Sequence, residues 1–166
     1  FFMCSVENLV KISSIVQDID NKLNYQKEIL CLKNGFYIGD VYVWDNGSWY
    51  YGGEKNRYAH GYGIFYDVVS KNIFSKYVGQ FKNGKFHGIG TIKNCDGEYY
   101  SGCWQNGYRH GMGNTYFLNG NIEVGNYMYN SPDGWFKTIY SKSKRNVRGY
   151  TCLYNMGNIL EYGELL

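Results

Sequence analysis

The chain has 166 residues, of which 22 are glycine, 19 are tyrosine and one is proline. With 19% aromatic residues and no repeating Gly-x-y triplet, this composition excludes a disordered chain and a collagen-like fibre. The net charge of +3 is too small to favour nucleic acid as a partner. The chain also lacks a run of about 18 apolar residues that would predict a membrane-spanning helix.

The first 33 residues have an apolar pattern that is typical of a helix. Apolar side chains recur at steps of three and four residues, at Val6, Leu9, Val10, Ile12, Ile15, Val16, Ile19 and Leu23. Because Ser5 is also a suitable N-cap, we predict that residues 1–33 form an α-helical cap on the rest of the chain. Residues 5–16 also resemble the second half of an F-box, which would imply a ubiquitin-ligase substrate adaptor. The sequence leaves both interpretations open.

An internal repeat occupies residues 34–166. Three segments, 50–66, 77–92 and 100–116, align without gaps. Each begins with Tyr-x-Gly, and each has His-Gly-x-Gly beginning ten residues after the first tyrosine. Weaker copies lie near 37–47, 123–136 and 150–166. Self-similarity of this kind is the signature of a repeat array.

Turn signals recur in step with these segments. They are the dipeptides Asn34-Gly35, Asn46-Gly47, Asn83-Gly84, Asp96-Gly97, Asn106-Gly107 and Asn119-Gly120. Such dipeptides tolerate positive φ at both positions, as type I′ hairpin turns require. We therefore predict a mainly β fold, a single-layer antiparallel β-meander with one hairpin per repeat.

The aromatic residues of each repeat share one face of the predicted sheet. Alternation places Tyr77, Gly79 and Phe81 on the same side, where a glycine between two rings leaves room for a ring from a neighbouring strand. Because a single layer cannot bury both faces against itself, we expect a protein partner or a second copy to cover this face. The predicted partner-binding residues are Tyr50, Tyr77, Phe81, Tyr100, Trp104 and Tyr127.

The repeat resembles the MORN repeat, in which Tyr-x-Gly is followed by an aromatic residue, an Asn-Gly turn and His-Gly-x-Gly. The match is best at 77–90 and 100–113, while the copy at 50–63 has Arg57 in place of the turn glycine. The resemblance implies an antiparallel ribbon that serves as an interaction, dimerisation or lipid-associated module. MORN arrays often accompany lysine methyltransferase or lipid kinase domains, but the motifs of those enzymes are absent here.

No catalytic or metal motif is recognisable. His60, His87 and His110 share one register, but neighbouring repeats would hold them about 10 Å apart, too far to ligate one metal ion with bonds of roughly 2 Å. The five cysteines form no Cys-x-x-Cys pair, so we expect free thiols and an intracellular protein. We expect neither enzymatic activity nor a cofactor.

A basic cluster offers a second kind of surface. Lys142, Lys144, Arg145 and Arg148 lie within seven residues that contain no acid, and such a cluster can face anionic lipid. The sequence therefore predicts a non-catalytic interaction and assembly scaffold, with an anionic-membrane-associated module or an F-box-type adaptor as alternatives. The abundance of Asn, Lys, Tyr and Ile indicates an AT-rich genome, and MORN-like and F-box-like segments together leave a virion-associated role open.

Overall fold

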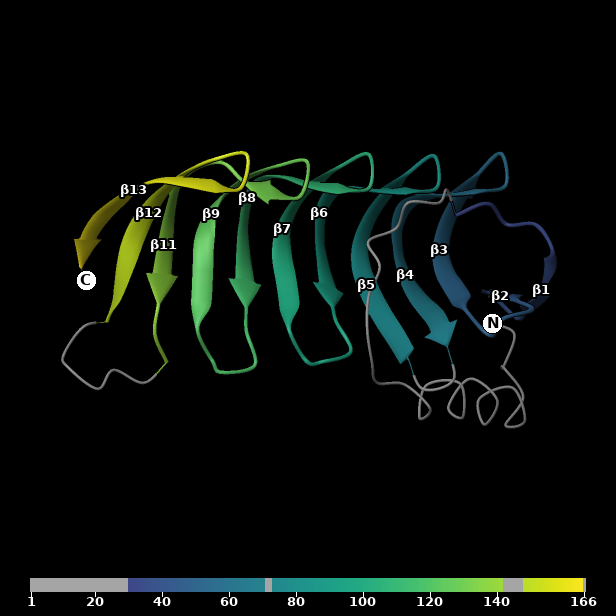
Figure 1. The fold of residues 1–166 in the computed structure, drawn as a ribbon. Coiled ribbons are helices and arrows are strands. Elements are labelled where there is room, and N and C mark those ends of the chain that lie inside the picture. The colour runs from purple at the N-terminus through teal and green to yellow at the C-terminus, as the bar shows by residue number, and fades with distance from the viewer. Residues whose placement is uncertain (1–29, 71–72, 142–147, 166) are drawn as a thin grey trace.

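The computed structural model describes residues 30–70, 73–141 and 148–165, and these residues form one antiparallel sheet of 13 strands (Figure 1). The strands are β1 (Gly35–Ile38), β2 (Val41–Trp44), β3 (Trp49–Lys55), β4 (Tyr58–Ser70), β5 (Ile73–Lys82), β6 (Lys85–Lys93), β7 (Tyr99–Gln105), β8 (Tyr108–Tyr116), β9 (Ile122–Met128), β10 (Ser131–Pro132), β11 (Gly134–Ile139), β12 (Gly149–Asn155) and β13 (Asn158–Leu165). Each strand lies beside the next one in the chain, except that β11 pairs with β9 while the short β10 extends the β9 hairpin. The predicted single-layer meander is confirmed.

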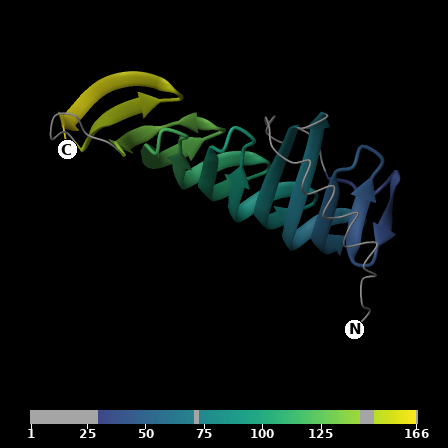
Figure 2. The ribbon, with the colours of Figure 1, turned by 90° about the horizontal axis from the view of Figure 1, so that it is seen from below.

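The turns of the meander form two rows along the long edges of the sheet (Figure 1). We call the turns of one row the tip turns; they join β3 to β4, β5 to β6, β7 to β8, β9 to β10 and β12 to β13. Seen from below, the strands follow one long axis (Figure 2). Neighbouring strands are about 4.8 Å apart, so each repeat of two strands adds about 10 Å to the length of the sheet.

Tip turns have the backbone conformation that the Asn-Gly signals predict. At Asn83-Gly84 the φ angles are 50° and 78°, and at Asn106-Gly107 they are 52° and 88°. The first tip turn has the same left-handed conformation at Asn56 and Arg57, with φ of 52° and 63°, although it has no glycine. The neighbouring repeats therefore impose the turn even where its preferred residue is missing.

At the centre of the core, each of the three clearest repeats has one tyrosine ring, Tyr50, Tyr77 or Tyr100, that lies along the sheet over two glycines. The Tyr77 ring is fully buried and stacks on Phe86 at a centroid distance of 3.7 Å. A Cβ atom at Gly90 would lie 2.2 Å from the Tyr77 hydroxyl oxygen. The ring thus occupies the space that any larger residue at position 90 would need.

A hydrogen bond fixes the end of each of these rings. The hydroxyl groups of Tyr50, Tyr77 and Tyr100 each donate to the backbone carbonyl three residues further on, at 2.6, 2.9 and 2.9 Å. In all three hairpins the pairing of the two strands has a β-bulge or similar irregularity just after the glycine of Tyr-x-Gly. The tyrosine therefore closes over the irregularity and satisfies one of its backbone carbonyls.

Neighbouring tip turns are also joined to one another. The backbone N–H of Gly84 donates to the Ala59 carbonyl at 2.8 Å, and that of Gly107 donates to the Phe86 carbonyl at 2.9 Å. The same bond recurs from Asn130 to Arg109 at 3.0 Å. Each repeat therefore contributes one backbone bond that holds its tip turn on the preceding repeat.

The predicted α-helical cap is not supported. Most of its range, 1–29, lies outside the described residues, and the described residues contain no helix. Just before the first strand, Cys31 instead forms an antiparallel bridge with Tyr58, and the Leu32 N–H donates to the Arg57 carbonyl at 2.7 Å. The backbone bonds of Tyr58 and Arg57 thus hold this segment in an extended conformation beside the first tip turn.

Candidate functional site

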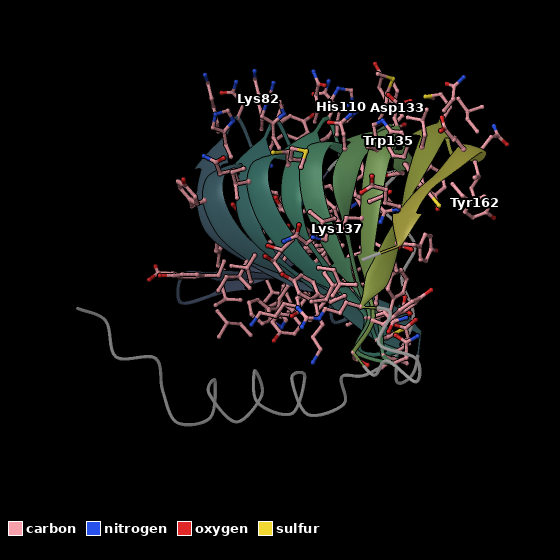
Figure 3. All side chains as sticks on the ribbon, turned by 90° about the vertical axis from the view of Figure 1, so that its left-hand side faces the viewer. Lys82, His110, Asp133, Trp135, Lys137 and Tyr162 are labelled. Atoms are coloured by element: carbon pink, nitrogen blue, oxygen red, sulfur yellow. The ribbon has the colours of Figure 1, made fainter. Side chains whose placement is uncertain are left out.

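The six residues predicted to bind a partner belong to the core. Their side chains are 0–3% exposed: Tyr50, Tyr77, Phe81, Tyr100, Trp104 and Tyr127. The curved strands (Figure 3) bring the rings of each repeat into edge-on contact with those of the next, for example Tyr77 with Trp104 at 5.5 Å. The prediction that these rings form an exposed face was wrong, because the sheet buries them against its own glycines and neighbouring rings.

Exposed apolar side chains instead lie on the opposite face, which we call the outer face. Strand alternation directs Tyr62, Ile89, Met112 and Trp135 to this side, and they are 72%, 60%, 58% and 52% exposed. All four occupy one position, the variable residue of His-Gly-x-Gly or, in the fourth copy, of Asp133-Gly134-Trp135-Phe136. We call these four side chains the outer ridge. It carries one side chain per repeat, so it spans three repeat intervals, about 30 Å.

The glycines of the motif explain why this position is exposed. The glycine before each ridge residue has positive φ, for example 75° at Gly61 and 92° at Gly111, and the glycine after it in the first three copies lies under the core tyrosine. The ridge residue between them therefore points away from the core and packs under no ring.

The ridge does not continue onto the last hairpin. Tyr162 occupies the equivalent position in sequence and is 71% exposed, but β13 pairs it with the buried Cys152. Since partners in a sheet share a face, Tyr162 lies on the core side of the edge strand (Figure 3).

The rest of the outer face is largely satisfied within the sheet. Trp49 stacks on Tyr66 at 4.3 Å and Tyr99 stacks on Tyr116 at 4.2 Å. Hydroxyls of Thr91 and Ser101 form a hydrogen bond of 2.9 Å. Tyr51 and Val78 of the same face are 49% and 42% exposed, so the ridge residues, at 52–72%, are more exposed than these two.

A row of histidines runs beside the tip turns, where Figure 3 shows His110, Asp133 and Lys82 along one rim. The backbone N–H of Asn83 donates to His60 Nδ1 at 3.4 Å, and the N–H of Met156 donates to an Asp133 carboxylate oxygen at 3.2 Å. Asp133 in the fourth copy thus accepts a bond from the next tip turn, as His60 does in the first copy. Burial, reinforced by Lys82, lowers the pKa of His87 from its ordinary value.

The three histidines are not part of a group of potential metal ligands in the described structure. Among residues 30–70, 73–141 and 148–165, no three His, Cys, Asp or Glu side chains are grouped as metal ligands. His60 and Asp133 contact the next tip turn through hydrogen bonds, and the His110 ring contacts Tyr129 at 5.2 Å, whereas Nδ1 of His87 and of His110 has no hydrogen-bond partner among the described residues.

The predicted anion-binding residues lie mostly beyond what the structure covers. Lys142, Lys144 and Arg145 are outside the described residues, and Arg148 is exposed just before β12, with its carbonyl accepting a bond of 2.8 Å from the Tyr140 N–H. In the part of the chain that the structure describes, no helix has the length and apolarity needed to cross a membrane.

This geometry defines a β-hairpin repeat protein with a tyrosine-and-glycine core. The family model of the MORN repeat matches residues 77–99 and 100–122, so the chain contains two adjacent MORN repeats. Repeats of this kind are commonly involved in protein or membrane interactions. A comparison with curated proteins found no match. The F-box resemblance of the N-terminal segment gained no support.

Proposed function

We propose that the chain is a non-catalytic interaction scaffold whose outer ridge contacts a protein partner. The observation that carries the proposal is the placement of Tyr62, Ile89, Met112 and Trp135 in one register, each more than half exposed. Aromatic and methionine side chains are the types enriched at interfaces.

The ridge side chains do not pack in the core, which leaves them accessible to a partner. The buried rings and backbone bonds stabilise each repeat, and the ridge side chains pack under none of those rings. A row about 30 Å long is compatible with a standard interface of roughly 800 Å² per partner. A second copy of the chain is one form that the partner could take.

Differential capture tests this proposal. The full chain and an Ile89→Ser/Met112→Ser variant serve as baits in lysate from the natural source, and Leu118→Ser is the matched control. Leu118 is an exposed leucine, 67% accessible, in the turn between β8 and β9 and off the ridge. We expect a set of proteins to be lost with the ridge variant and retained with the control.

Identical captured proteins for all three baits would refute the role of the ridge. Sedimentation of the purified chain across a range of concentrations distinguishes self-association from binding to another protein. If a dimer forms, the same ridge variant should shift it to monomer.

Association with anionic membranes is a second candidate, supported by the basic cluster Lys142, Lys144, Arg145 and Arg148. Each basic side chain near a charged surface contributes about 1 kcal/mol. Flotation with phosphatidylserine vesicles should then fall when the four residues are neutralised. Flotation that is independent of phosphatidylserine would exclude this candidate.

A further inference from the structure

A notch opens near the N-terminal edge of the sheet, where β3 continues beyond Val41, the first residue of β2. Its cavity of about 540 Å³ is lined by Tyr37, Gly39, Asp40, Tyr51, Gly52, Gly53, Glu54 and Tyr62. Tyr62 is also the first residue of the outer ridge, so the notch continues the surface proposed above.

One side of the notch is an open strand edge. The pairing of β2 with β3 stops at Val41 and Tyr51, whereas β3 continues through Gly52 to Lys55. On its other side β3 remains paired with β4, from Gly52 with Gly63 to Lys55 with Tyr58. Among the described residues, Gly52 and Glu54 therefore have a strand neighbour on one side only, whereas Gly53 lies in the irregularity of the β3–β4 pairing and its carbonyl accepts from the Tyr50 hydroxyl. Open edges of this kind accept an added extended segment through backbone hydrogen bonds.

The side chains around this edge favour a cation. Tyr37, Tyr51 and Tyr62 are 54%, 49% and 72% exposed, so their rings are accessible. Asp40 and Glu54 contribute two carboxyl groups to the lining. The basic side chains of Lys33 and Arg57 belong to the adjoining cavity, which also borders Tyr37 and Glu54. The Tyr37 hydroxyl donates to Glu54 Oε2, which leaves Oε1 to accept from a ligand. Rings and carboxylates together are the environment that binds ammonium and guanidinium groups.

We propose that this notch binds a lysine or arginine side chain on an extended segment of the protein partner. The backbone of that segment pairs with the open edge beside Gly52 and Glu54. Its basic side chain enters the notch beside the Tyr37 ring and Glu54, which lie on the core side with their strand partners Tyr42 and Ala59, while Tyr51 and Tyr62 line the notch from the outer face. This inference rests on the proposed function, because it assigns chemistry to one end of the surface on which the partner docks.

A peptide titration followed by amide NMR tests the notch without the natural partner. The probe is a blocked pentapeptide, Val-Thr-Arg-Thr-Val, and its control has citrulline in place of arginine, which keeps the shape and removes the charge. We expect saturable shifts of the amide signals of Gly39, Gly52 and Gly53. The citrulline peptide should bind about tenfold more weakly, and the arginine peptide should weaken with added salt.

Asp40→Asn/Glu54→Gln is the matching protein variant, since glutamine still accepts the Tyr37 hydroxyl. It should weaken arginine binding about tenfold while keeping the dispersed spectrum of the folded chain. The control variant Glu161→Gln removes an exposed carboxylate on β13 and should bind as the unmodified chain does. Equal binding of the citrulline peptide, equal binding by the double variant, or shifts that avoid the notch would each overturn the proposal.

The Ile89→Ser/Met112→Ser variant separates the two proposals. It should titrate normally with the arginine peptide, because neither residue lines the notch. Normal titration together with unchanged capture by the ridge variant would refute the ridge alone. Loss of captured proteins with the ridge variant, together with no response to the peptide, would refute the notch alone.

Discussion

Gly90→Ala tests the packing that makes this fold possible. The added Cβ would lie 2.2, 2.4 and 2.6 Å from three atoms of the Tyr77 side chain. Tyr77 cannot move aside easily, because its ring is fully buried and contacts Phe81, Phe86 and Trp104 at centroid distances of 5.0, 3.7 and 5.5 Å. The ring must therefore shift and disturb its neighbours.

Two contributions set the size of the effect. Overpacking of a close-packed core costs about 1–3 kcal/mol. Displacement of the ring also removes the bond from the Tyr77 hydroxyl to the Gln80 carbonyl, 2.9 Å long, which contributes about 1 kcal/mol. We expect a loss of about 2–4 kcal/mol in the free energy of unfolding, or roughly 5–15 °C in Tm.

Urea unfolding followed by tryptophan fluorescence measures this loss, with Gly61→Ala as the control. Gly61 is the first glycine of the motif, with φ of 75° and no atom within 4 Å of an added Cβ, so only backbone strain of about 1–2 kcal/mol should appear. In a Tyr77→Leu background, which lacks the three clashing atoms, Gly90→Ala should cost much less. A cost no greater than that of Gly61→Ala, or an undiminished cost with Tyr77→Leu, would refute the reasoning.

Three further predictions concern hydrogen bonding, pH and the ridge. Tyr100→Phe removes the hydroxyl that donates to the Cys103 carbonyl and should cost about 0.5–1.5 kcal/mol in urea unfolding, whereas Tyr99→Phe, at an exposed ring, should cost little. Because the pKa of His87 is lowered in the folded protein, the unfolded chain takes up the proton first as pH falls below about 6.5. The free energy of unfolding should therefore be highest above that pH and fall as the pH approaches the pKa of His87 in the folded protein. An equal decline in the His87→Asn variant would contradict this. Ile89→Ser/Met112→Ser should change the free energy of unfolding by no more than about 0.5 kcal/mol per site, and a larger loss would mean that the ridge stabilises the fold.

Local signals in the sequence were enough to predict the meander. Hairpin turns depend on backbone conformations that Asn-Gly dipeptides favour. Both residues have positive φ at Asn83-Gly84 and Asn106-Gly107, as predicted, whereas at Asn46-Gly47, Asp96-Gly97 and Asn119-Gly120 only the glycine does, and at Asn34-Gly35 only the asparagine does. The recurrence of Tyr-x-Gly and His-Gly-x-Gly predicted the repeat itself, which the family match over 77–122 confirms. These features are local in the chain, so a periodic sequence is sufficient to reveal them.

The exposed face could not be identified in the same way. Alternation shows that Tyr77 and Phe81 share a face, but it gives no information on how far the sheet curves or how tightly rings from successive repeats pack. The sequence does contain a signal for the exposed positions. The variable residue of His-Gly-x-Gly is Tyr62, Ile89 or Met112, which is apolar in each repeat and lies between two glycines. The motif does not require an apolar residue at this position. Its recurrence in register therefore indicates an exposed apolar row such as the ridge.

The sequence by itself determined the antiparallel hairpin array, because turn conformation and strand alternation are properties of short segments. Only the tertiary structure decided which face is covered, because burial depends on rings from one hairpin meeting glycines and rings of the next. The notch beside Gly52 and Glu54 likewise arises from the unequal lengths of two paired strands, which no local motif specifies.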